Sequence, residues 1–230
     1  MSLEELVRKG DTLYAAFDNR KALVYYQKAW ELAPQDAELL TKLTWTCNNV
    51  GEDLDSKASE PYFSLAIVYA EKLKKLAPKS SLTWFLSAIV NGNLGLHRGG
   101  KQKVTLSRHV AEDAKKAIAL DPNFSPGYVV LGVYYREVAT LNWALRMAAK
   151  HLLGGLPSGT LKQAEQMLLT GIKKEPGNVY AHYQLAITYE VMKKPKKAVT
   201  YYRNVVRLPV VDHQDPVFKK KSKARISELE

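Results

Sequence analysis

The sequence has little cysteine, few acidic residues relative to basic ones and no long apolar run. Its 230 residues include a single cysteine, Cys47, which excludes an internal disulfide bond. No run approaches the roughly 20 apolar residues that a transmembrane helix requires, and the first residues lack the apolar stretch of a signal peptide. We therefore expect a cytoplasmic protein, with the periplasm or export as the alternative if a leader was removed. Membrane binding is not expected without an anchor outside this sequence.

Motifs for catalysis and for metal binding are also missing. The five histidines show no H-E-x-x-H spacing, no cysteine pair accompanies them, and no G-x-S-x-G motif occurs. The stretch GLHRGGKQ, residues 95–102, has the glycine and lysine spacing of a phosphate-binding loop. It ends in Gln102 where such a loop holds magnesium through Ser or Thr, and it follows an expected helix rather than a strand. We predict no enzyme, no metal site and no cofactor, and we interpret 95–102 as a basic turn.

The scarcity of acidic residues leaves a net charge of +11, since Lys and Arg exceed Asp and Glu by 34 to 23. This excess favours acidic partners such as nucleic acid, anionic lipid or acidic protein tails. The basic clusters KKPKK (193–197) and KKKSKAR (219–225) lack the interleaved aromatic residues expected for single-stranded nucleic acid. We do not expect nucleic-acid binding, and we interpret most basic clusters as solvated helix faces and turns.

One spacing of small, aromatic and proline residues recurs along the chain. KALVYYQKAWELAP at 21–34 is echoed by AEQMLLTGIKKEP at 164–176 and by AVTYYRNVVRLP at 198–209. Upstream of the second, YVVLGVYY at 128–135 fits the W-x2-L-G-x2-Y signature of a tetratricopeptide repeat, with tyrosine in place of tryptophan. Each helix pair of such a repeat leaves an apolar face that only the next pair can cover. The sequence therefore predicts a tetratricopeptide array.

Alignment on the prolines gives five helix pairs in one all-α domain that covers residues 1–230. We predict a right-handed superhelix with inserted helices in units two to four and a capping helix at the carboxyl end. His182 and Cys47 fall on core positions of the repeat, so we predict a structural histidine and a buried, unreactive thiol. The units span about 3–35, 37–79, 81–123, 125–177 and 179–210, and the capping helix spans 215–229.

The longest insertion, at about 138–160, is predicted to contain an extra amphipathic helix. We expect its leucines to turn inward, with Trp143 and Met147 packed on a flank against the groove aromatics, which would narrow or close the groove. Arg146 and Lys150 would then lie at the rim with their charges in water. The alternative is a mobile arm with a free apolar face. The expected apolar face contains Leu141, Leu145, Ala148 and Leu152, and Gly154 and Gly155 are expected to end the helix.

The stretch YREVATLNWALRMAAKHLLGGLPSGTLKQAEQML at 135–168, together with the long-period repeats, resembles the tetratricopeptide core of the regulator of microtubule dynamics family and its bacterial relatives. Its most specific parts are 135–139, Trp143, 148–150 and 154–157, and the resemblance covers most of the chain. It implies an all-helical interaction protein without known catalytic residues, linked in some animal members to microtubules or organelle membranes.

The first helix of each pair in such an array lines a concave groove. The expected groove positions are mostly apolar, so we do not expect a carboxylate clamp of Lys, Asn and Arg. We predict a non-enzymatic scaffold that binds a protein or peptide partner in the groove, of unknown oligomeric state. The alternatives are an apolar or acidic small ligand, with Arg136 as a fixed positive charge, and electrostatic binding to microtubule tails or nucleic acid. The predicted groove residues are Tyr14, Trp45, Asn48, Asn49, Phe85, Ile89, Asn93, Val133, Arg136, Glu137, Tyr183, Ile187 and Glu190.

Overall fold

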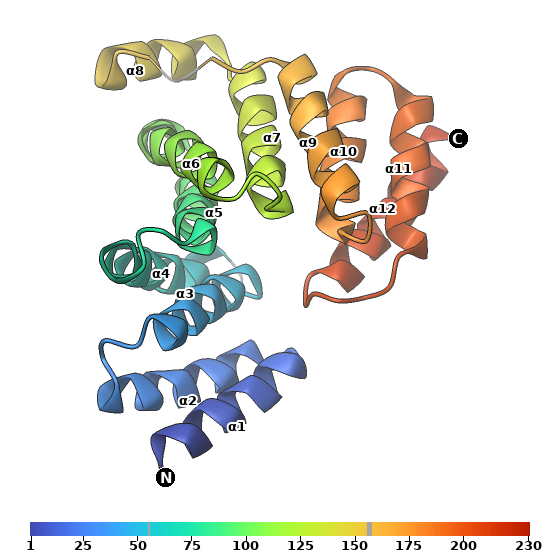
Figure 1. The fold of residues 1–230 in the computed structure, drawn as a ribbon. Helices are drawn as coiled ribbons and strands as arrows, with labels where there is room; N and C mark the ends of the chain where they lie inside the picture. Colours follow the sequence, from blue (N-terminus) through green and yellow to red (C-terminus); the bar gives the residue numbers. More distant parts are fainter. Residues whose placement is uncertain (55, 156–157) are drawn as a thin grey trace. The chain divides into compact units, whose positions relative to one another are not determined.

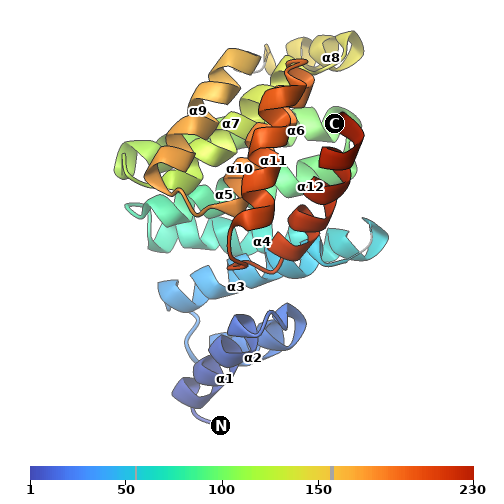
Figure 2. The same ribbon diagram turned by 90° about the vertical axis from the view of Figure 1, so that its right-hand side faces the viewer.

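The computed structural model describes residues 1–54, 56–155 and 158–230, without the side chains of residues 56, 152 and 153. All regular secondary structure within these ranges is α-helical (Figures 1 and 2). The chain forms two compact units, Met1–Leu120 and Asp121–Glu230. The boundary between them falls between the third and the fourth predicted helix pair.

The amino-terminal unit consists of three successive antiparallel helix pairs, and neighbouring pairs are joined by packing of α2 on α3 and of α4 on α5 (Figure 1). Close approach within the first pair depends on Gly10, because a Cβ atom there would lie 2.4 Å from the Tyr26 ring. The pairs are α1 (Leu3–Ala15) with α2 (Asn19–Leu32), α3 (Ala37–Glu52) with α4 (Ser56–Leu76), and α5 (Ser81–Arg98) with α6 (Gly100–Leu120).

The extra residues of the second and third pairs lengthen the paired helices instead of forming separate ones. Leu94 near the end of α5 and Val104 near the start of α6 are both buried, so the shared apolar face continues along the added turns. The inserted helices predicted for these two pairs are therefore extensions of α3 to α6, because lengthening a pair buries apolar side chains that a separate short helix would leave exposed.

The carboxy-terminal unit contains two helix pairs, a separate inserted helix and a terminal helix. The pairs form between α7 and α9 and between α10 and α11, while α12 packs on both α10 and α11 as the predicted capping helix (Figure 2). Its helices are α7 (Ser125–Ala139), α8 (Trp143–Leu153), α9 (Leu161–Lys174), α10 (Val179–Val191), α11 (Pro195–Arg207) and α12 (Asp215–Leu229).

The inserted helix α8 forms where the sequence predicts it, but its orientation differs. Gly154 ends it in the left-handed conformation, at φ 67°, as expected. Ala149 is buried, whereas Trp143 is 76% exposed, so the expected packing of Trp143 against groove aromatics is wrong. The side chain of Ala149 is therefore packed, whereas the indole of Trp143 lies in water. The predicted inward position of Leu152 and the segment 156–157 lie outside the described residues.

One polar contact recurs at the start of the first helix in three pairs. The residue at the tryptophan position of the repeat signature donates a hydrogen bond to the carbonyl of a proline six residues earlier, which fastens the helix to the preceding turn. Tryptophan, tyrosine and histidine each donate this hydrogen bond, which explains why tyrosine and histidine can replace tryptophan. The contacts join Trp84 Nε1 to Pro78 O at 2.8 Å, Tyr128 Oη to Pro122 O at 3.0 Å, and His182 Nε2 to Pro176 O at 3.0 Å.

A buried ion pair connects α4, α5 and α6 in the amino-terminal unit. Lys74 Nζ lies 2.9 Å from Asp113 Oδ2, and Ser87 Oγ donates to the same oxygen at 2.6 Å. The Lys74 ammonium also lies 5.2 Å from the centre of the Trp84 ring. Because Asp113 is buried, losing Lys74 would leave its carboxylate with only the Ser87 hydroxyl, whereas Lys74 also pairs with Glu71 Oε1 at 3.1 Å.

The buried imidazole of His182 should make stability depend on pH. Burial lowers the pKa of His182, and the hydrogen bond to the Pro176 carbonyl only partly opposes this effect. The unfolded chain therefore binds a proton below a pH of about 6.5 while the folded chain resists it, so stability falls as the pH drops from about 6.5 toward the folded pKa. Urea denaturation at neutral and mildly acidic pH should show this loss. His182→Tyr, which copies Tyr128, should fold and lose less stability at mildly acidic pH than the parent does. Equal losses of stability in the parent and the variant would contradict a role for His182 in the pH dependence.

The buried ion pair of Lys74 and Asp113 should contribute more to stability than an exposed ion pair does. Asp113→Ala should lower the free energy of unfolding by about 1.5–3 kcal/mol, because Ser87 loses its buried acceptor and Lys74 keeps only its ion pair with Glu71. Glu112→Ala is a matched control on the same helix, since it breaks an exposed pair with Arg108, and it should cost less than about 1 kcal/mol. Chemical denaturation of both variants measures the two losses of unfolding free energy. Similar losses would contradict a larger stabilising contribution from the buried pair.

Candidate functional site

Several predicted groove residues form a seam between the first helices of consecutive pairs. In the amino-terminal unit, the rings of Trp45 on α3 and Phe85 on α5 lie 5.5 Å apart. One turn further along, Asn93 Nδ2 donates to Asn48 Oδ1 at 2.8 Å. Phe85 and Asn48 are buried. These side chains therefore hold α3 to α5 and offer little free surface to a partner.

An asparagine chain joins the first pair to the second. Asn49 Nδ2 on α3 donates to Asn19 Oδ1 on α2 at 3.4 Å, and Asn19 Nδ2 donates to Asp53 Oδ2 at 2.9 Å. Asn19 and Asn49 are buried, and the chain of hydrogen bonds ends on the exposed carboxylate of Asp53. The predicted groove residue Asn49 thus serves the junction between helix pairs.

Arg136 makes the corresponding connection in the carboxy-terminal unit. Its Nη1 donates to Gln184 Oε1 at 2.7 Å and to the Gln184 carbonyl at 3.2 Å, which ties α7 to α10. Its Nη2 donates to Glu137 at 3.2 Å, and the side chain is buried. The guanidinium is therefore committed to intramolecular partners and does not stand as a free positive charge for an acidic ligand.

The terminal helix α12 covers the predicted groove residues of α10. The Tyr183 ring stacks on Phe218 with centroids 4.8 Å apart. Glu190 forms an ion pair with Arg225 and accepts a hydrogen bond from the Tyr202 hydroxyl. Burial raises the pKa of Glu190, but the Arg225 and Tyr202 hydrogen bonds outweigh it and leave that pKa below its ordinary value. In this unit, the last helix α12 therefore packs on part of the predicted groove face.

The predicted groove set therefore divides by burial. The four buried members act in the seams, and binding by the part-exposed members stays a prediction. The sequence analysis did not predict that these residues join neighbouring first helices. Their similar offsets from the repeat signature are the pattern that could have indicated this role. The buried members are Asn48, Asn49, Phe85 and Arg136, and the part-exposed members are Tyr14, Trp45, Ile89, Asn93, Val133, Glu137, Tyr183, Ile187 and Glu190.

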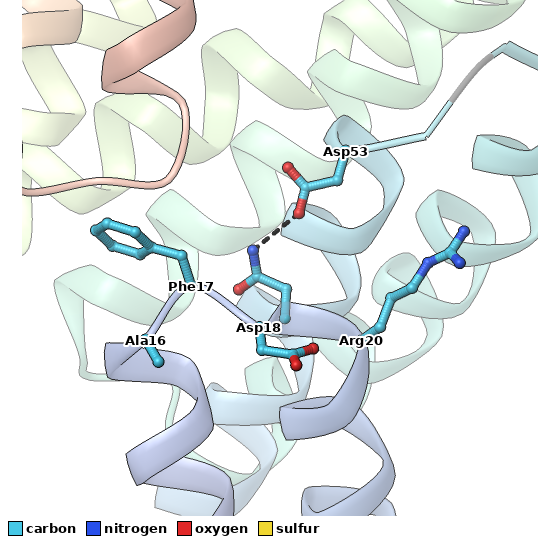
Figure 3. Close-up of a pocket in the computed structure, with 6 residues that line it drawn as sticks. Ala16, Phe17, Asp18, Arg20 and Asp53 are labelled. Atoms are coloured by element: carbon cyan, nitrogen blue, oxygen red, sulfur yellow. Dashed lines mark hydrogen bonds between the residues drawn. The ribbon is translucent and has the colours of Figure 1, made fainter.

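An open pocket of about 350 Å³, which the sequence did not predict, lies at the turn between α1 and α2 beside the end of α3 (Figure 3). The hydrogen bond from Asn19 to Asp53 lies within it, with the side chains of Phe17 and Arg20 on either side. An aromatic side chain, two carboxylates and a guanidinium thus share one small surface. The lining residues are Ala16, Phe17, Asp18, Asn19, Arg20 and Asp53.

Phe17 occupies an unfavourable backbone conformation at the edge of this pocket. Its φ is 61°, in the left-handed region that suits glycine, and its side chain is 43% exposed. The turn between α10 and α11 is equivalent, since Lys193 has a φ of 57° and Lys194 N donates to Tyr189 O just as Asp18 N donates to Leu13 O. Neither burial nor backbone preference explains an aromatic residue at position 17.

The structure also places Cys47 and the glycine-rich stretch 95–102. Cys47 is buried and burial raises the pKa of its thiol to about 12, which confirms the unreactive thiol. Gly99 and Gly100 have positive φ and connect α5 to α6, so 95–102 contains a helix-to-helix turn. Across the described residues, no group of three or more His, Cys, Asp or Glu could hold a metal ion, and no helix has the length and apolarity to cross a membrane.

Comparison with solved structures establishes the fold. A thermophilic TPR protein of Thermus thermophilus superposes with a TM-score of 0.74 over 98% of this chain and 100% of that one, at 18% identity. The type IV pilus biogenesis factor PilW gives a TM-score of 0.55 over 98% of this chain and 86% of that one, at 14% identity. At these identities the likeness shows the tetratricopeptide fold alone.

Comparison with known sequences identifies the family. Regulator of microtubule dynamics protein 2 of Bos taurus is 26% identical over 67% of this chain and 38% of its own length. Regulator of microtubule dynamics protein 3 of Mus musculus is 27% identical over 66% of this chain and 32% of its own length. The chain thus spans about a third of these relatives. Because the model of the family described as Regulator of microtubule dynamics protein 1-3 matches residues 6–230, the chain belongs to that family.

Proposed function

We propose that this chain is an interaction scaffold that binds a protein or peptide partner through its amino-terminal unit, with Phe17 as the principal contact. The observation that carries the proposal is the exposed aromatic ring of Phe17 on a left-handed backbone beside an open pocket. A left-handed L-residue costs about 1–2 kcal/mol, and a half-exposed ring recovers little of that cost by burial. Such local strain is characteristic of binding sites.

The surroundings of Phe17 suit a polypeptide better than a small ligand. The pocket is open, so it would bury one side chain of a partner rather than enclose a whole molecule. Aromatic side chains are frequent hot spots of protein interfaces, and Arg20 and Asp53 can supply polar contacts around the ring. The hydrogen bond between Asn19 and Asn49 connects the pocket to the predicted groove face of α3. A partner chain bound at the pocket can therefore extend along α3.

The proposal predicts that stability and binding will change in opposite directions when Phe17 is replaced. Phe17→Gly should raise the free energy of unfolding by up to about 1 kcal/mol, because glycine tolerates positive φ. The same variant should bind the partner at least about tenfold more weakly, because the aromatic contact is lost. Affinity capture with the parent chain identifies the partner, and titration then measures the affinity of each variant. The family name makes tubulin the first defined partner to test.

Lys193→Gly is the matched control, because it relieves the same backbone conformation in the equivalent turn of the other unit. It should raise stability by a similar amount and leave the affinity unchanged. A more stable Phe17→Gly variant that binds poorly cannot be explained by misfolding. If Phe17→Gly binds the captured partner as tightly as the parent does, the proposed contact is wrong.

A further inference from the structure

The inserted helix α8 presents an exposed face that the packing of its unit does not explain. Trp143 is 76% exposed, the highest value among the large apolar side chains of the described residues. Trp143, Met147 and Lys150 follow one another at spacings of four and three residues, so they form one stripe along the helix. Ala149, on the other side, is buried. The stripe thus combines an exposed indole, a half-buried thioether and an exposed ammonium group.

The charge of this face has one sign. Arg146 and His151 flank the stripe, and the helix sequence WALRMAAKHLL contains no acidic residue. The whole chain carries a net charge of +11, which adds a long-range attraction to acidic surfaces. A cationic helix with an exposed tryptophan has the composition of a helix that lies in a membrane interface.

Hydrogen bonds within residues 139–146 shape the turn that leads into α8. Asn142 caps α8 by accepting from Leu145 N at 2.9 Å. Arg146 donates from Nε to Leu141 O at 2.9 Å and from Nη2 to Ala139 O at 3.0 Å, which caps the end of α7. These contacts set the turn between α7 and the start of α8.

We propose that α8 docks peripherally on anionic phospholipid bilayers, with Trp143 and Met147 at the level of the headgroups and Lys150 on the acidic lipid. Indole rings favour the membrane interface, and a basic side chain near an anionic leaflet adds about a fivefold gain in binding. A helix that lies on a bilayer inserts its side chains between lipid headgroups, so it needs no complementary pocket. An acidic protein tail offers charge but no apolar layer for Trp143 and Met147, so the apolar stripe favours lipid. This site lies on a different unit from Phe17 and stands apart from the proposed scaffold function.

Vesicle flotation of the full chain tests the proposal. Phosphatidylcholine vesicles that contain phosphatidylserine should bind the chain, and pure phosphatidylcholine vesicles should bind it far more weakly. Trp143→Ala should reduce partitioning by about tenfold and Lys150→Gln by about fivefold. Both positions are solvent-facing, and thermal melting of each variant checks that the fold is retained. Emission of the parent should shift to the blue on binding, and that shift should disappear in Trp143→Phe.

Two matched controls separate this site from general attraction. Leu32→Ala removes an apolar side chain that is 59% exposed on α2, and Lys196→Gln removes one exposed positive charge on α11. Both should leave partitioning close to that of the parent. The proposal is overturned if these controls weaken binding as much as the α8 variants do, or if the chain fails to bind acidic vesicles at low salt. It is also overturned if Trp143→Ala weakens binding to polyglutamate but not to vesicles, because the face would then serve an acidic protein.

Discussion

The structure depends on one constraint: a pair of helices cannot bury its own apolar face and must be covered by the next helix. The first helices meet this constraint through their facing side chains. Trp45 meets Phe85, Arg136 meets Gln184, and Tyr183 meets Phe218 on the terminal helix. Through the last of these contacts, α12 packs on α10.

This constraint also shows which features the packing does not require. Residues in the seams and at the proline carbonyls are buried or half-buried and contact a neighbouring helix or turn, so packing accounts for them. Phe17 and Trp143 differ, because one adopts a strained backbone and the other leaves an indole in water, and neither supports a neighbouring helix. Side chains that reduce stability without any packing role are the best candidates for binding. Membership of the family does not assign these contacts, since the chain spans about a third of its relatives.

Much of the fold could be predicted from local spacing. The signature at 128–135 places Gly132 where a Cβ atom would lie 2.7 Å from the Leu168 side chain, so the glycine and its partner helix follow from one pattern. Prolines marked the ends of pairs because they stop helices, and Gly154 ended α8 for a similar reason.

The candidate sites were harder to predict because periodicity shows which residues share a helix face but not which neighbour covers that face. The sequence therefore assigned Arg136 and Phe85 to a groove, whereas Phe85 packs on Trp45 of the preceding first helix and Arg136 binds Gln184 of the following one. The same ambiguity reversed the orientation of Trp143. Phe17 escaped notice because the left-handed turn is usually marked by glycine, and a phenylalanine there gives no turn signal.

A double-mutant cycle across Tyr183 and Phe218 tests the central claim most directly. If a first helix and the helix that covers it hold the unit together through their facing residues, Tyr183→Ala and Phe218→Ala should show a coupling energy of about 0.5–1.5 kcal/mol in chemical denaturation. The double variant would then be more stable than the sum of the single losses predicts. Losses that add within about 0.3 kcal/mol would contradict the claim, because the stacked rings would then contribute independently of each other.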